Sequence, residues 1–270
     1  MITSFDMILA PIVSFLVGIV AAMIGVGGGV FIVPFLTLVS GFSPQHAVGT
    51  SLAMIVCTSL SSTIQYSRQR RVDFKFGLIL TIATIPGAFL GAYLTAFFTA
   101  KLLGLTFGIF LILVALRMAL PSNPRKPNPS KTRRGWRRKL VDSDGSIFEY
   151  DTNVILGFAL SFFGGLSSGL LGIGGGSLMV PILHLIAGLP IHITVATSMF
   201  IMIFTSTSAV ATHFWLGNVH PDYALLLTIG VIFGAQLGAH YSKKVSGRNL
   251  RRLFAVVLFL VSVRMILKYI

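Results

Sequence analysis

The chain has 270 residues, of which 54% are hydrophobic and only 10% are charged, and its mean hydropathy is +0.88. Soluble domains carry roughly a quarter of charged residues, so this composition excludes a soluble globular protein. The net charge of +14 does not indicate nucleic-acid binding, because eight of the 21 Lys and Arg residues fall between Arg125 and Lys139. Clustered basic loops are typical of the cytoplasmic side of membrane proteins. We therefore predict an all-α polytopic integral membrane protein that binds no nucleic acid.

The first apolar stretch covers residues 5–42, and no basic segment precedes it. We therefore expect it to remain in the membrane rather than to be removed as a signal peptide. Further uncharged or nearly uncharged stretches reach the roughly 18-residue length of a membrane-spanning helix. They lie at residues 47–66, 76–98, 102–120, 194–215 and 223–241.

An internal repeat organises the chain. When the sequence is shifted by 147 residues, GVGGGVFIVPFL at 25–36 lies over GIGGGSLMVPIL at 172–183 without a gap, and Thr50-Ser51 lies over Thr197-Ser198. Such repeats are a common build of secondary transporters. We predict a first transmembrane repeat at residues 1–120, a basic, proline-bearing cytoplasmic linker at 121–153 and a second transmembrane repeat at 154–270.

Two topologies are compatible with this repeat. Each half starts with a long apolar stretch, at residues 5–42 and 154–189, that contains the glycine cluster. If this stretch crosses the membrane once, each half has four spans and the two halves run parallel. If the chain turns back at the glycines, each half crosses an odd number of times and the halves are inverted. Inversion places 18 of the 21 Lys and Arg residues on one face, against 15 for the parallel arrangement. The positive-inside rule therefore favours two homologous inverted repeats, with the helices broken at the Gly-rich turns and the linker in the cytoplasm.

The two glycine clusters are the candidate binding site. Glycine costs roughly 1 kcal/mol relative to alanine in a helix, so the clusters predict breaks. Broken helices at matching positions of two halves mark transport sites, and a restarting helix offers N–H groups to an anion. Hydroxyl groups would add donors. We predict an oxyanion cradle made of Gly25, Gly27, Gly28, Gly29, Thr50, Ser51, Gly172, Gly174, Gly175, Gly176, Ser177, Thr197 and Ser198.

Glycine clusters also permit close packing of helices, and this remains an alternative for both of them. For the Gly-x-x-x-Gly segments at 87–91 and 234–238, helix contact is the preferred interpretation. A homodimer through these faces is a further possibility. The clusters are not phosphate-binding loops, since no Gly-Lys-Ser/Thr follows them.

The polar residues exclude other functions. Every acidic residue falls in a loop or at the end of a segment, which disfavours a carboxylate-based proton pump. His184 and His213 lie in or near spans and are the candidates for proton coupling. Arg68, Arg70 and Arg71 are candidates for concentrating anions at the cytoplasmic mouth, although a role as topology anchors is the preferred interpretation. No motif of an intramembrane enzyme is present, and we expect no enzyme activity, no cofactor and no metal.

The doubled Gly-x-Gly-Gly-Gly…Val-Pro-x-Leu pattern, with Ala-Val-Gly-Thr-Ser at 47–51, resembles the TauE/SafE sulfite exporter family, also called TSUP. The second copy departs from it, because Thr194-Val195-Ala196-Thr197-Ser198 has no glycine at the position of Gly49. The resemblance implies transport of sulfite or a related small sulfur compound across the cytoplasmic (inner) membrane.

Three functions follow for testing. The first is export of sulfite or a related anion by alternating access. The second is proton-coupled uptake of organosulfonates, which would depend on His184 or His213. The third is a membrane subunit that transports nothing itself.

Overall fold

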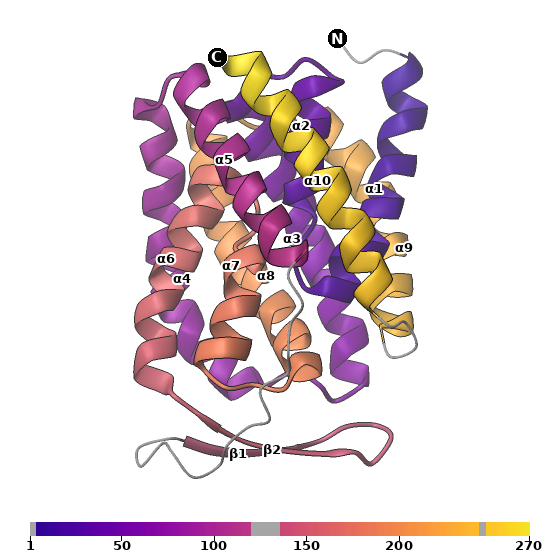
Figure 1. Ribbon diagram of the computed structural model, residues 1–270, viewed down its shortest axis with the longest axis vertical. Coiled ribbons are helices and arrows are strands. Elements are labelled where there is room, and N and C mark those ends of the chain that lie inside the picture. The colour runs from indigo at the N-terminus through magenta and orange to yellow at the C-terminus, as the bar shows by residue number, and fades with distance from the viewer. Residues whose placement is uncertain (1–3, 120–135, 243–246) are drawn as a thin grey trace.

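The computed structural model describes residues 4–119, 136–242 and 247–270 (Figure 1). The basic run at 125–134 of the predicted linker lies outside these residues. Within the described ranges all elements are helical except for one two-stranded sheet, which confirms the predicted all-α class.

The first repeat contains one broken helix followed by three long ones. Its elements are α1 (Ser4–Ile24), α2 (Gly29–Leu38), α3 (Pro44–Arg68), α4 (Phe74–Leu94) with a 3-10 turn η1 (Thr95–Phe97), and α5 (Ala100–Ala119). Local side chains fix the starts of two helices. The Ser43 hydroxyl accepts the His46 N–H ahead of α3, and the Asp73 carboxylate accepts the Phe76 N–H at 3.1 Å ahead of α4.

The second repeat has the same order. Its elements are α6 (Val154–Leu171), α7 (Gly176–Pro181) continued by a π-helical turn η2 (Ile182–Ile186), α8 (Ile191–Trp215), α9 (Pro221–Tyr241) and α10 (Gly247–Tyr269). Helices α7, α8, α9 and α10 each begin 147 residues after α2, α3, α4 and α5. The offset found in the sequence therefore recurs in the helix boundaries.

The two repeats are interleaved. Helix α1 lies along α9, and its repeat equivalent α6 lies along α4, while α3 packs on α8 and α5 on α10. The Gly-x-x-x-Gly segments make the first two contacts possible. A Cβ at Gly234 or Gly238 would strike the carbonyl oxygen of Phe15 or Ile19 on α1. Gly87 and Gly91 stand against the equivalent carbonyls of α6.

The predicted role of these faces as helix contacts is thus confirmed. Both faces pack on helices of the same chain, and the homodimer stays a prediction. Close backbone approach through small residues is the usual way in which membrane helices pack without a hydrophobic driving force.

A β-hairpin, which the sequence did not predict, closes one end of the bundle. Its strands β1 (Trp136–Val141) and β2 (Ile147–Thr152) pair antiparallel, with Arg138 opposite Tyr150. Figure 1 shows the hairpin beyond one end of the helices and both chain ends at the other. We call these the hairpin end and the termini end.

Five helices of the described ranges are long and apolar enough to cross a membrane, namely α3, α4, α6, α8 and α9. Shorter apolar helices, including α2 and α7, lie among them. Large apolar side chains such as Ile82, Phe233 and Leu225 are more than 60% exposed on the helices, as lipid-facing residues are. The chain is a multi-pass membrane protein.

Candidate functional site

The two glycine clusters form tight turns that break the helices, as predicted. In the first turn, Gly25, Gly27 and Gly28 have φ angles of 82°, 81° and 98°. In the second turn, Gly172, Gly174 and Gly175 have φ angles of 67°, 69° and 78°. These left-handed values strain any residue with a Cβ, so the geometry requires glycine at each position.

The turns pack directly on each other. A Cβ at Gly29 would strike the carbonyl oxygen of Gly172, and a Cβ at Gly176 would strike that of Gly25. These two contacts are equivalent under the 147-residue offset. The glycine turns of the two repeats therefore meet backbone to backbone at the centre of the pseudo-symmetric structure. The glycines that were predicted to bind an anion are therefore the same glycines that allow the two repeats to pack closely.

Serine hydroxyl groups bond each turn to the other repeat. The Ser51 hydroxyl on α3 donates to the carbonyl of Gly172 at 2.8 Å, and the Ser198 hydroxyl on α8 donates to that of Gly25 at 3.1 Å. Both serines are fully buried. In this conformation their hydroxyl protons are directed to the protein backbone, so a solute that needs them must break these bonds.

The neighbouring threonines make a second reciprocal pair. Thr50 accepts the backbone N–H of His220 at 3.1 Å, and Thr197 accepts that of Asp73 at 3.0 Å. His220 and Asp73 stand immediately before α9 and α4, at equivalent positions of the two repeats. Of the five hydroxyl groups predicted from the sequence, the two serine and two threonine hydroxyls of α3 and α8 thus come together around the turns and bond across the repeat boundary.

The space between the turns is filled by two apolar side chains that the sequence analysis missed. Ile55 of α3 and Met202 of α8 are fully buried and are equivalent under the repeat. A Cβ at Gly27 would lie 2.9 Å from Met202 Sδ and 3.2 Å from Ile55 Cγ2, and a Cβ at Gly174 would meet the same two side chains. The sequence analysis missed them because an apolar residue within an apolar helix does not differ from its neighbours.

The second turn has two hydroxyl groups that the first turn lacks. Ser168 near the end of α6 and Ser177 in the first turn of α7 each have a buried hydroxyl without a hydrogen-bond partner. Ser168 Cβ lies 3.4 Å from the place that a Cβ on Gly175 would take. The equivalent residues of the first repeat, Ala21 and Val30, are apolar. Ser168 could have been found by examining every hydroxyl within one helical turn of the glycine clusters.

The hairpin is bound to the loop between α3 and α4. Asp73 accepts hydrogen bonds from Arg138 Nη2 at 2.6 Å and Nε at 3.0 Å and from the Tyr150 hydroxyl at 2.8 Å. Two residues earlier, Arg71 Nη2 pairs with Asp142 at 2.9 Å, and both side chains are over 90% buried. Asp73 also donates its backbone N–H to the Thr197 hydroxyl. This one residue therefore links the hairpin to the hydroxyl groups around the glycine turns.

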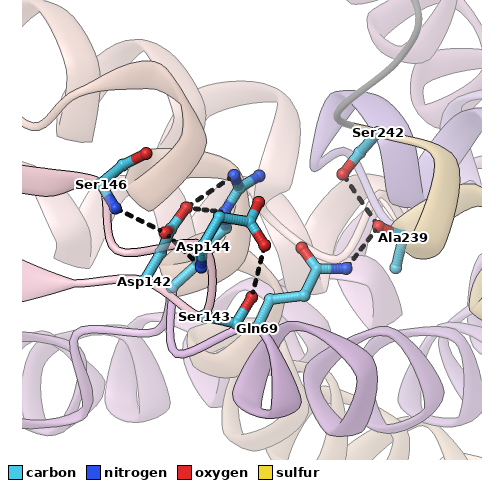
Figure 2. A network of polar contacts seen from close by, with 8 residues as sticks. Gln69, Asp142, Ser143, Asp144, Ser146, Ala239 and Ser242 are labelled. Carbon is cyan, nitrogen blue, oxygen red and sulfur yellow. Dashed lines mark hydrogen bonds and ion pairs between the residues drawn. The ribbon is translucent and has the colours of Figure 1, made fainter.

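Hydrogen bonds order the tip of the hairpin and connect the neighbouring α3–α4 loop to α9. Asp142 accepts the N–H groups of Asp144 at 2.8 Å and Ser146 at 3.1 Å, and Gln69 donates to the carbonyl of Ala239 at 3.0 Å (Figure 2). Every group of this network comes from the hairpin, the α3–α4 loop or the end of α9. The α3–α4 loop therefore contacts both the hairpin and the end of α9 in the second repeat.

The electrostatics of the network favour charged carboxylates. Burial alone would raise the pKa of Asp73, but the hydrogen bonds from Arg138, the Phe76 N–H and Tyr150 outweigh it and lower this pKa. For Asp142, the bonds from Arg71 and from two N–H groups likewise overcome desolvation and lower the pKa. Both ion pairs are consequently retained at neutral pH.

The arginines predicted at the mouth divide into two kinds. Arg68 and Arg70 are exposed, as a residue that attracts anions from solution must be. Arg71 is 6% exposed and is neutralised by Asp142, so it adds little to a positive field at the mouth. For Arg71, the structure shows a buried ion pair in place of an open anion collector, because the hairpin provides a partner that no local sequence pattern predicted.

The two candidate histidines are hydrogen-bonded within the protein. His184 Nδ1 lies 2.8 Å from the carbonyl oxygen of Leu189. His213 is fully buried, with Nε2 at 2.9 Å from the carbonyl oxygen of Gly169 and Nδ1 at 3.3 Å from the Asn218 amide nitrogen. Their use in proton coupling stays a prediction.

A separate cavity of about 370 Å³ opens at the termini end between α2 and α10. It is lined by Leu38, Arg264, Leu267 and Lys268, and Lys268 donates to the carbonyl of Thr37 at 2.6 Å. None of the predicted site residues lines it.

Comparison with known proteins agrees with this architecture. The family model described as "Sulfite exporter TauE/SafE" matches residues 10–265. A probable membrane transporter protein of Bacillus subtilis, YunE, is 37% identical over 96% of this chain and 97% of its own length. A probable membrane transporter protein of Methanocaldococcus jannaschii, MJ0441, is 27% identical over 95% and 94%, respectively. An Arabidopsis thaliana protein named "Sulfite exporter TauE/SafE family protein 6" is 28% identical over 51% of this chain and 32% of its own. No solved structure matches the chain.

Proposed function

The chain belongs to the TauE/SafE sulfite exporter family, and from this premise we propose that it exports sulfite or a related small sulfur-containing anion by alternating access. It works as a transporter of the cytoplasmic membrane rather than as an enzyme. The observation that carries the proposal is the reciprocal contact of the two glycine turns, each bonded to a serine of the other repeat.

The chemistry of the turns suits an oxyanion. Helix α2 begins directly after Gly28, and no side chain caps its first N–H groups, so the positive end of the helix dipole faces the turn. The unpartnered hydroxyls of Ser168 and Ser177 provide donors beside the second turn. These groups can replace part of the hydration shell of a small anion. The site supplies partial charges rather than a fixed cation, which favours release.

The arrangement of the ends supports inverted repeats. Figure 1 shows α1 beginning and α10 ending at the termini end, whereas the hairpin that precedes α6 lies at the opposite end. An odd number of crossings per half gives this arrangement. With the charge distribution of the loops, it supports a hairpin end in the cytoplasm.

The direction of transport follows from the membrane potential. Moving one elementary charge through 100 mV changes the free energy by about 2.3 kcal/mol. A negative cell interior therefore drives an anion outward without a coupled proton. Uptake of the same anion would require coupling to overcome this term.

The test is flux of labelled sulfite in proteoliposomes, with and without an imposed potential. We expect flux that follows the potential and needs no pH gradient. Flux that depends on a pH gradient and disappears in His213→Gln would instead favour proton-coupled uptake. No flux of sulfite or of small organosulfonates by folded protein would contradict the proposal.

A matched pair of glycine variants tests the cradle. Gly28 and Gly41 both have left-handed φ angles, of 98° and 73°, but only Gly28 belongs to a turn at the centre. A Cβ at Gly28 would contact Val17 and Met54, whereas at Gly41 it would meet open space. We expect Gly28→Ala to reduce flux at least about tenfold, which corresponds to roughly 1.4 kcal/mol. Gly41→Ala should retain most of the flux, and equal losses in both variants would show that the effect is general backbone strain.

A further inference from the structure

The proposed oxyanion site is covered by apolar atoms in this conformation. Ile55 Cδ1 lies 2.8 Å from the place that a Cβ on Gly29 would take, and Met202 Sδ lies 2.8 Å from the equivalent place on Gly176. Each side chain also borders Gly27 and Gly174. These two side chains therefore occupy space directly beside the glycine backbone.

Polar groups flank this apolar pair on both helices. Ser51 and Ser59 lie one helical turn before and after Ile55 on α3, and Ser198 and Ser206 lie in the same way around Met202 on α8. Residues four apart share one face of a helix. All four serines are fully buried. The α3–α8 contact therefore alternates between hydroxyl groups and apolar atoms along its length.

We propose that Ile55 and Met202 form a gate between the two glycine turns, and that Met202 is the half that moves. The inference rests on the proposed transport function and adds the residues that control access to its site. An apolar constriction is a barrier to an anion because it offers no replacement for the lost hydration shell.

The two side chains differ in how easily they can move. Isoleucine is branched at Cβ and is largely restricted to one χ1 rotamer in a helix. Methionine is unbranched, has three rotatable bonds and adapts to irregular spaces. The pseudo-symmetric gate thus has one rigid half, on α3, and one adaptable half, on α8.

The surroundings of Met202 agree with this assignment. The hydroxyl of Ser206 is buried without a partner, whereas its equivalent on α3, Ser59, donates to the carbonyl of Val56 at 3.0 Å. The two unpartnered hydroxyls beside the glycine turns, on Ser168 and Ser177, also belong to the second repeat. Unpartnered buried hydroxyls occur in both repeats, but those that flank Met202 or the glycine turns, on Ser168, Ser177 and Ser206, all belong to the second.

The repeat supplies its own matched variants. Met202→Ile makes the adaptable half rigid, and Ile55→Met makes the rigid half adaptable. Both exchanges nearly conserve volume, and such exchanges are usually tolerated by a packed core. Met202→Ala removes most of the side chain. Elution as a single species in detergent identifies the variants that remain folded.

Access to the gate is measured with a cysteine beside it. The only native cysteine, Cys57, is first replaced by serine. Ser206→Cys then introduces a thiol at a position where no hydrogen bond is lost. The rate of its modification by a small anionic methanethiosulfonate is followed in detergent, where both ends of the protein are reachable, and sulfite flux is measured in proteoliposomes for each variant.

We expect Met202→Ile to slow the modification at least about fivefold, which corresponds to roughly 1 kcal/mol in the barrier, and to lower flux in parallel. Ile55→Met should leave the rate unchanged or raise it, and Met202→Ala should raise it. Equal rates in Met202→Ile and Ile55→Met, or no modification in any variant including Met202→Ala, would overturn the gate.

The two readouts separate this inference from the proposed function. If modification follows the exchanges while no variant carries sulfite, the gate stands and sulfite transport fails. If the unmodified chain carries sulfite and neither readout responds to the exchanges, transport stands and the gate fails.

Discussion

The loops at the two ends of the bundle occupy equivalent positions of the repeat but are held very differently. The α3–α4 loop at the hairpin end and the α8–α9 loop at the termini end each donate one backbone N–H to a threonine of the other repeat. Even the backbone is alike, since Arg70 and its equivalent Gly217 both have positive φ angles, of 55° and 74°. The loops differ in the side chains around that shared contact.

At the hairpin end, Asp73 is fully buried among Arg138 and Tyr150. At the termini end, the equivalent residue, His220, is exposed and rests against the rings of Phe42 and His46, with centroids 4.7 Å away in both cases. One loop is fixed by charge-assisted hydrogen bonds and the other by weaker ring contacts. The hairpin thus converts a symmetric backbone contact into an asymmetric one.

This asymmetry bears on the transport cycle. In the proposed alternating access between two inverted halves, the repeat symmetry alone would make the two ends equally easy to open. The hairpin adds two buried ion pairs at one end, and within residues 4–119, 136–242 and 247–270 the other end has no ion pair that corresponds to them. Among the described residues, the α3–α4 loop is accordingly held by more charged contacts than the α8–α9 loop.

The largest expected effect comes from removing the central residue of each loop. Asp73→Ala leaves the Arg138 guanidinium without its partner and removes the cap of α4, and we expect it to lower the free energy of unfolding by about 3 kcal/mol. His220→Ala keeps its backbone N–H and loses only ring contacts, so its cost should stay below about 1 kcal/mol. Thermal unfolding of both variants in detergent measures the difference. Equal destabilisation would show that the two ends are held alike.

A smaller effect is expected from acid. The folded-state pKa values of Asp73 and Asp142 are lowered, so their contribution to hairpin binding is complete above the ordinary aspartate value of about 3.9 and is lost as the pH falls through the lowered values. In a Trp215→Phe variant, Trp136 of the hairpin is the one remaining tryptophan, and its emission reports on detachment. We expect constant emission from pH 8 to pH 5 and a change only in stronger acid. A transition near pH 6 would instead indicate that protonation of a histidine detaches the hairpin.

Much of this comparison could be predicted from the sequence. The 147-residue offset gives the equivalence of the loops, and the left-handed glycines follow from the cost of glycine clusters in helices. The Gly-x-x-x-Gly segments predicted that their helices make close contacts, and the structure shows that the partners are α6 for α4 and α1 for α9. These features are visible because each depends on what glycine permits locally, and because each occurs twice.

The remainder depends on partners that no local pattern identifies. Arg71 looks like a basic loop residue until Asp142, 71 positions later, neutralises it. The hairpin has ordinary polar strands whose binding site is made by Asp73, in another part of the chain. Ile55 and Met202 are apolar residues in apolar helices, and only the folded structure shows that they meet the glycine turns.

The smallest expected effect distinguishes the two faces of the hairpin itself. Glu149 pairs with Lys139 at 3.2 Å and with Arg137 at 3.5 Å, but the three side chains are 46%, 59% and 81% exposed, respectively. Exposed pairs are screened by water and salt, so Glu149→Gln should leave the Trp136 emission and the acid transition unchanged. Asp142→Asn likewise removes one carboxylate, but from a buried ion pair. Because Asp73 alone then holds the hairpin, this variant should move the acid transition toward neutral pH. If Glu149→Gln had the same effect, the hairpin would be attached through general charge rather than through its two buried ion pairs, and the asymmetry between the two ends would weaken with added salt.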